Sequence, residues 1–255
     1  SEMCIRDRMS AVSKVKVPLT TNPRFQKEAA EIALQMSQFS VDELERLLRV
    51  NAKIAVENYK RYQAFHAEAT PELPALLAYT GIVFKRLNPK DFSAEDFGYA
   101  QEHLRLTSFC YGLLRPLDVI RAYRLEGDVV LPELGNQTLF SYWRSRLTDT
   151  FIEDIRSAGG ILCNLASDEM KSLFDWKRVE SEVRVVTPEF HVWKNGKLAT
   201  IVVYTKMSRG EMTRFILKNK IGNPEELKGF SWEGFEFDES LSDEKKLVFI
   251  NGMGE

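Results

Sequence analysis

A run of arginines and carboxylates at residues 111–127, YGLLRPLDVIRAYRLEG, has the residue types to bind an anion. Pro116 ends or kinks the helix expected before it and would display Arg115 on a turn. A guanidinium there can donate paired hydrogen bonds to a phosphate or carboxylate. The alternative, which the spacing slightly favours, is an internal lattice in which arginines pair with the carboxylates that follow them. The polar residues are Arg115, Asp118, Arg121, Tyr123, Arg124 and Glu126.

A second polar cluster, CNLASDEMKS at residues 163–172, follows a short apolar run. Its polar residues are Asn164, Ser167, Asp168 and Glu169. A buried strand that runs into such residues matches the usual ligand position in open α/β sheets, a crevice at the carboxyl end of a strand. The alternative is a helix cap, in which Ser167 or Asp168 bonds the next backbone N–H groups. The two interpretations are compatible.

The third cluster is YTKMSRGEMTRF at residues 204–215. We expect a strand to deliver Lys206, and a helix to begin near Arg209 and Gly210, with Arg214 one turn later. The N–H groups and positive dipole end of a helix favour an anion there, and Gly210 lets the backbone approach it closely. The alternative is a set of solvated basic residues on a helix face.

The common catalytic motifs are absent from the sequence. It contains no glycine-rich phosphate loop and no GxSxG elbow, and His66, His103 and His191 lack metal-ligand spacing to cysteines or carboxylates. We therefore predict no cofactor and no metal site, and motifs alone support no enzyme class.

Composition indicates a globular chain with an uneven charge distribution. The 255 residues carry a net charge of −2, which argues against bulk binding of polyanions, but residues 171–220 hold 11 basic and 5 acidic side chains. Residues 221–255 hold 3 basic and 9 acidic ones, so the two segments either form a basic site or neutralise each other. The three scattered cysteines fit a reducing cytoplasm, and no stretch approaches the roughly 20 apolar residues of a membrane span.

The elements that must position the clusters change in type along the chain. The first half reads as helices at residues 23–39, 40–50, 51–65, 92–112 and 136–160, with a capping box at Ser40 and Glu43 and an N-cap at Ser93. The second half alternates between strands and helices. We expect strands at 160–166 and 246–251, and a hairpin within 182–206 whose two strands flank the turn Asn195-Gly196. Helices are expected at 208–222 and 223–230. We predict one α+β (mixed α/β) domain, a helical half packed on a mixed sheet.

Taken together, the clusters resemble the YaaA family of peroxide stress proteins. The matching stretches occur in family order, cover about Val15 to Asn251, and are specific in combination rather than singly. They are VPLTTNPRF, DFSAEDFGYAQEHLRLTSFCYGLLRPLDVIRAYRLEG, LFSYW, NLASDE and YTKMSRGEMTRFILKNKI.

The resemblance implies a cytosolic bacterial protein that limits oxidative damage during peroxide stress by keeping unincorporated iron low. It also implies a single mixed α/β domain with a basic cleft, associated with DNA binding through an element similar to a helix-hairpin-helix. It assigns no catalytic residue. The family's polar signature falls on Arg115, Asp118, Tyr123, Arg124, Glu126, Asn164, Ser167, Glu169, Lys206, Arg209 and Gly210.

The N-terminus departs from the family, which begins with a short strand followed by Ser-x-Ala-Lys-Thr and so places a lysine near the cleft. Residues 9–14, MSAVSK, give no such strand. Residues 1–8, SEMCIRDR, can be encoded by the tail of a transposase library adapter, so we predict a non-native leader. The domain at 9–255 would then lack its first strand and expose an unpaired sheet edge.

Two functions follow from these residues. The first is duplex DNA binding through phosphate contacts from Arg115, Arg121, Arg124, Lys206, Arg209 and Arg214. The second is an enzyme for a small anionic or nucleotide-like substrate, with Glu169 as candidate general base and Lys206 and Arg209 as the anion clamp. Direct iron sequestration is poorly supported, because only Asp118, Glu126 and Glu169 could contribute ligands. We expect a monomer without membrane contact.

Overall fold

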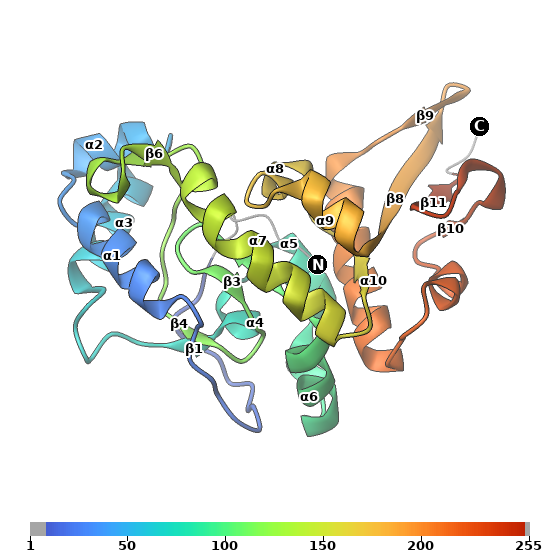
Figure 1. Cartoon of the computed structure of the whole chain (residues 1–255), viewed down its shortest axis with the longest axis horizontal. Coiled ribbons are helices and arrows are strands. Elements are labelled where there is room, and N and C mark those ends of the chain that lie inside the picture. The colour runs from blue at the N-terminus through green and yellow to red at the C-terminus, as the bar shows by residue number, and fades with distance from the viewer. Residues whose placement is uncertain (1–8, 253–255) are drawn as a thin grey trace.

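The computed structural model describes residues 9–252, and the predicted leader at residues 1–8 lies outside the described residues. Figure 1 shows a helical N-terminal part, a long central helix and a C-terminal part built around a twisted sheet. This arrangement confirms the predicted mixed α/β class.

The N-terminal part consists mainly of short capped helices. Ser40 and Glu43 form the predicted capping box, and Ser93 caps its helix as predicted, with Asp96 completing a second box. The elements are α1 (Gln26–Met36), α2 (Val41–Leu47), α3 (Ala52–Ala64), α4 (Ala75–Ala78), α5 (Ile82–Leu87), the 3-10 turn η1 (Pro89–Asp91) and α6 (Ala94–His103).

The helix expected to continue to residue 112 ends at His103 instead. The chain then forms an antiparallel hairpin of β2 (Leu106–Ser108) and β3 (Gly112–Leu114). Gly112 has a φ of +70°, and a Cβ there would lie 2.7 Å from the ring of Trp143 on α7 (Leu139–Ser157). Tight packing against α7 thus overrides the helical pattern, and Arg115 follows a strand rather than a helix.

Two further strand pairs connect these helices to α7. They are β1 (Leu73–Pro74) with β4 (Val119–Ile120), and β5 (Val130–Leu131) with β6 (Gln137–Thr138), the second pair enclosing the 3-10 turn η2 (Pro132–Leu134). Thr138 then caps α7 by accepting a hydrogen bond from the N–H of Ser141.

The main sheet has the order β10-β11-β8-β7, and β9 pairs with β8. β7, β8 and β11 run parallel, whereas β9 and β10 are antiparallel to their neighbours. Asn195 and Gly196 both have positive φ, as the predicted type I′ turn requires. The elements are β7 (Ile161–Cys163), α8 (Asp168–Lys171), α9 (Trp176–Glu182), β8 (Arg184–Lys194), β9 (Lys197–Ala199), α10 (Val202–Asn219), η3 (Pro224–Gly229), β10 (Phe235–Phe237), η4 (Glu239–Leu241) and β11 (Lys246–Asn251).

The strand predicted to deliver Lys206 is wrong beyond Ala199, because α10 begins at Val202. A Cβ on Gly210 would clash with the carbonyl oxygen of Val83 and lie 2.8 Å from Cβ of Arg86, both on α5. Gly210 is therefore inside a long helix that packs closely on α5, not at a helix start facing an anion. Tertiary packing outweighs the strand preference of the β-branched run at 201–203.

Two apolar cores lie on either side of α10. The first packs the N-terminal helices against α7 and includes Trp143 and Leu217, and the second lies under the sheet and includes Phe249 and Met212. Because Leu217 and Met212 both belong to α10, this helix joins the two cores into one unit.

Candidate anion-binding site

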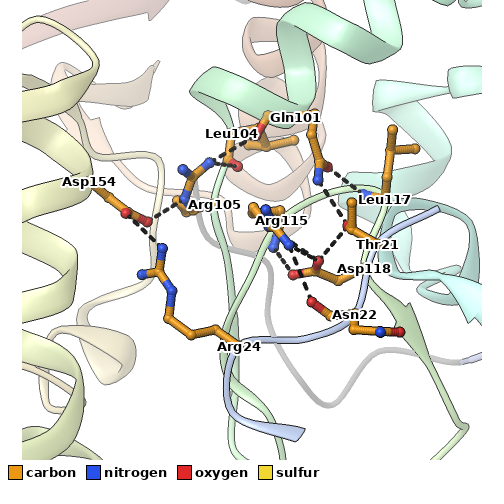
Figure 2. A network of polar contacts seen from close by, with 10 residues as sticks. All are labelled: Thr21, Asn22, Arg24, Gln101, Leu104, Arg105, Arg115, Leu117, Asp118 and Asp154. Atoms are coloured by element: carbon orange, nitrogen blue, oxygen red, sulfur yellow. Dashed lines mark hydrogen bonds and ion pairs between the residues drawn. The ribbon is translucent and has the colours of Figure 1, made fainter. Parts of the chain in front are cut away.

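The Arg115 turn is an internal lattice, as the spacing slightly favoured. Arg115 donates to the carboxylate of Asp118 through Nη2 at 2.9 Å and through its backbone N–H at 2.8 Å. Asp118 is 1% exposed and also accepts from Thr21 Oγ1 at 2.6 Å. Gln101 then bridges Thr21 and the N–H of Leu117 (Figure 2). Arg115 and Asp118 therefore hold this turn together.

A second ion-pair group lies beside this turn. Arg105 Nε donates to Asp154 at 2.6 Å, and Arg24 reaches the other oxygen of the same carboxylate at 3.2 Å (Figure 2). Because Asp154 belongs to α7 and Arg105 follows α6, the pair fastens these two helices and the N-terminal segment to one another.

Two other predicted cations are also paired within the chain. Arg121 bonds Glu72 at 2.9 Å and the carbonyl oxygen of Phe65. Arg214 donates to Asp91 at 2.9 Å and to the carbonyl of Asn88 at 2.7 Å. The hydrogen bond from Arg214 to Asp91 holds the pKa of Asp91 below its usual value.

Tyr123 lies in the core rather than on an open surface. Its hydroxyl is hydrogen-bonded to Tyr79 at 2.6 Å and to Ser108 at 2.5 Å, and burial raises its pKa well above the usual value. The predicted supporting residue is thus part of a buried hydroxyl network.

The segment 124–128 brings part of the first cluster close to the second. Arg124 lies 3.8 Å from the nearly buried Glu126, and its buried Nε has no hydrogen-bond partner within residues 9–252. Arg49 bonds Asp128 at 2.7 and 3.0 Å. Hydrogen bonding to Asp128 raises the pKa of Arg49, and the charges of Glu126 and Glu169 add to this effect. Arg49 therefore lies within electrostatic range of both the 124–128 segment and Glu169 of α8.

Sequence reasoning missed Arg49. The residue stands more than 70 positions before its partner Asp128, and no motif links the two. A weak structural signal is its φ of +51°, which is unusual for a residue other than glycine and ends α2 sharply.

The second cluster follows β7 as predicted. Asn164 is 3% exposed, and its Oδ1 accepts from the N–H of Ala166 at 3.1 Å, but its Nδ2 finds no partner within residues 9–252. Ser167 occupies the N-cap position of α8, as the alternative interpretation expects, but its side chain makes no capping hydrogen bond. A hydrogen bond from Lys171 lowers the pKa of Asp168, and the charge of Arg209 contributes further.

The third cluster contributes two cations of α10 that are unpaired among the described residues. Lys206 and Arg209 occupy the first turns of this helix, and their side chains make no hydrogen bond or ion pair with the residues that the structure describes. The effect of Arg209 on Asp168 places α10 near α8. The structure thus brings together residues 124–128, residues 164–169 and the start of α10, whereas Arg115, Arg121 and Arg214 are held by other partners.

Neither a metal site nor a membrane helix appears within residues 9–252. No group of three or more His, Cys, Asp and Glu side chains is arranged there to hold a metal ion. None of the helices in this range combines the length and the apolar character that a membrane crossing requires.

Comparison with known proteins gives consistent matches over nearly the whole chain. Residues 6–241 match the family model described as "Peroxide stress protein YaaA". A UPF0246 protein of Bacteroides thetaiotaomicron is 98% identical over 247 residues, which is 97% of this chain and 96% of the relative. UPF0246 proteins of Bacteroides fragilis and Porphyromonas gingivalis are 78% and 52% identical, over 97% and 91% of this chain and 96% and 91% of the relatives.

Proposed function

The chain belongs to the YaaA family of peroxide stress proteins, and from that premise we propose that it binds duplex DNA through a surface formed by α5, η1 and α10. The supporting observation is a set of cations whose side chains make no hydrogen bond or ion pair with residues 9–252. These are Lys85 on α5, Lys90 on η1, and Lys206 and Arg209 on α10.

Close packing holds these elements in fixed positions relative to one another. Gly210 lets α10 approach the α5 backbone, and Arg86 of α5 contacts both Met207 Sδ at 3.7 Å and Glu211 at 3.7 Å on α10. Cations on a rigid helix pair need little reordering to meet successive phosphates. Such contacts give affinity without sequence choice and weaken as salt rises.

DNA binding of this kind would limit damage at the occupied sites during peroxide stress. It requires no metal ligand from the protein, and Lys206 and Arg209 remain the central predicted contacts. Four phosphate contacts correspond to a slope of about −3.6 for log affinity against log salt concentration.

Fluorescence anisotropy with a labelled duplex, titrated at several salt concentrations, tests this proposal. We expect binding at low salt that falls steeply with salt, and a loss of about tenfold or more in the Lys206→Ala/Arg209→Ala variant. The matched control is Lys53→Ala/Lys60→Ala, which removes the same charge from two exposed lysines of α3. Absent binding at low salt, or equal losses in both variants, would overturn the proposal.

A second candidate is catalysis on a small anionic substrate, with Glu169 as the general base. The observation favouring it is the approach of Glu126, Glu169 and Arg49 on one side and Asp168 and Arg209 on the other. Carboxylates repel a phosphate backbone but can serve acid–base chemistry beside an anion clamp.

The Glu169→Gln variant separates the two candidates. Removing this negative charge leaves DNA affinity unchanged or raises it if the surface binds DNA, but abolishes turnover if Glu169 is the base. A pull-down of cell metabolites followed by mass spectrometry identifies a substrate. A site that retains no metabolite while DNA binding is intact counts against catalysis.

A further inference from the structure

The β8–β9 hairpin projects from the main sheet and leads into α10. β11 pairs with β8 only as far as Val192, so within residues 9–252 the end of the hairpin, residues 193–198, pairs with no strand outside the hairpin. Figure 1 shows this end extending beyond the other strands, with β9 leading back to the start of α10. The hairpin is therefore joined directly to the helix that carries Lys206 and Arg209.

Two lysines face each other across the turn of this hairpin. Lys194 and Lys197 are cross-strand partners, and both are exposed. Like charges directly opposite each other in an antiparallel pair are destabilising. Neither lysine side chain makes an ion pair or hydrogen bond with residues 9–252. The pair therefore costs the fold some stability, which an anionic partner would offset.

The next cross-strand pair of the hairpin is apolar and exposed. Trp193 is 46% exposed, and its partner Leu198 is 39% exposed. Because successive side chains of a strand point to opposite faces, Trp193 and Leu198 share one face of the hairpin and the two lysines share the other. Exposed apolar side chains that gather in one place mark a binding surface.

Charge and width select the partner of this hairpin. Residues 193–209, which run from the hairpin to the first turns of α10, hold four basic side chains and no acidic one. They therefore continue the surface that is proposed to meet DNA phosphates. A two-stranded ribbon fits the DNA major groove, which is about 12 Å wide, but not the minor groove, which is about 6 Å wide. The apolar groups exposed in the major groove are the C5-methyl groups of thymine.

We propose that the β8–β9 hairpin enters the major groove of the bound duplex, where Trp193 and Leu198 contact thymine methyl groups. Lys194 and Lys197 then reach phosphates at the edge of the groove. This inference rests on the proposed function, because it extends the same DNA surface from α10 onto the hairpin. It adds a preference for thymine to phosphate contacts that carry no sequence choice by themselves.

Two labelled duplexes of one sequence test this preference, one with thymine and the other with uracil at the same positions. The uracil base differs from thymine only in lacking the methyl group, so the charge and the base pairing are the same. In fluorescence anisotropy we expect the parent protein to bind the uracil duplex about fourfold more weakly or worse, as the loss of one buried methyl group implies. The slope of log affinity against log salt should be equal for both duplexes, because their phosphates are identical.

Variants of the hairpin separate its apolar and basic pairs. Trp193→Ala/Leu198→Ala should bind the thymine duplex about tenfold more weakly, lose the difference between the two duplexes and keep the salt slope of the parent. Lys194→Ala/Lys197→Ala should instead make the slope shallower by about 1.8.

The matched control for the apolar pair is Leu241→Ala. The Leu241 side chain is 37% exposed, close to the value for Leu198, but it lies on η4 in the acidic C-terminal segment. This variant should bind both duplexes as the parent does. Thermal unfolding shows that each variant is folded, and the comparison of the two duplexes on the parent protein needs no variant.

Failure of this inference differs from failure of the proposed function. The inference is overturned if the parent binds both duplexes equally, or if the thymine preference survives in Trp193→Ala/Leu198→Ala, even when DNA binding still depends on Lys206 and Arg209. Parent-like affinity of Trp193→Ala/Leu198→Ala also overturns it and leaves the hairpin to another partner, such as an acidic protein. Absence of binding to either duplex at low salt overturns the proposed function as well.

Discussion

At the Arg115 turn, the guanidinium bonds Asp118 at 2.9 Å, and the carboxylate it meets is almost fully buried. On the first turns of α10, Lys206 and Arg209 have no such partner within residues 9–252. The comparison shows that a cation that folding places beside a carboxylate is used to hold the structure together. Lys206 and Arg209, which pair with no carboxylate within residues 9–252, remain available to a ligand. The predictions below test this division, beginning with the largest expected effect.

Replacing Asp118 by alanine should be the most damaging of these changes. It leaves Arg115, its backbone N–H and Thr21 without their shared acceptor in a buried turn, so we expect a loss of about 3 kcal/mol in the free energy of unfolding. Urea denaturation measures the loss. The control is Asp168→Ala, because the Asp168 side chain is 93% exposed in its ion pair with Lys171. This substitution should lower the free energy of unfolding by less than about 0.5 kcal/mol. Equal effects of the two substitutions would contradict the division.

Gly210→Ala tests the packing that fixes the α10 cations. The added methyl group meets the α5 backbone at Val83, and we expect the free energy of unfolding to fall by about 2 kcal/mol. Gly222→Ala is the matched control, since nothing lies within 4 Å of a Cβ at that position. If Gly210→Ala is as mild as the control, α5 does not constrain α10 as described.

Asp96 provides a third paired region, at the other end of α10. Burial opposes its ionisation, but hydrogen bonds from Lys218 and Lys220 outweigh burial and lower its pKa below the usual value. The folded protein therefore holds this carboxylate ionised more strongly than the unfolded chain does. The resulting stability is present above about pH 4 and is lost as pH falls toward the lowered pKa.

The Asp96→Asn variant should therefore be less stable at neutral pH by about 1 kcal/mol, which includes the weakened capping box of α6. Its stability should also depend less on pH between about pH 4 and 2. Thermal unfolding across this pH range gives both quantities. A variant with the acid sensitivity of the parent would show that Asp96 is not a source of it.

The smallest effect on stability is expected at the unpaired cations. The side chains of Lys206 and Arg209 make no ion pair or hydrogen bond within residues 9–252. The free energy of unfolding of the double alanine variant should therefore lie within about 0.5 kcal/mol of that of the parent. A larger loss, measured by urea denaturation, would mean that these side chains serve folding as Arg115 does.

Local chemistry allowed several elements to be predicted. The capping residues Ser40 and Ser93 and the Asn195-Gly196 turn are satisfied by neighbours a few residues away. The polar cluster after β7 was also found, because an apolar run that ends in Asn164 is visible without tertiary contacts.

The remaining features depend on distant packing. The β2–β3 hairpin packs tightly on α7 through the contact of Gly112 with Trp143, and α10 packs on α5 through the contact of Gly210 with Val83. Arg49 joins the candidate site only because folding brings it to Asp128. No local pattern encodes these pairs.

The most direct test measures how duplex DNA binding depends on salt in two sets of variants, one in the first turns of α10 and one later in the same helix. Lys206→Ala/Arg209→Ala removes the two cations that have no partner within residues 9–252, and we expect the slope of log affinity against log salt to become shallower by about 1.8. Arg214→Ala removes a cation that is paired with Asp91, and the slope should stay that of the parent. A shallower slope for Arg214→Ala, with no change for the double variant, would contradict the account.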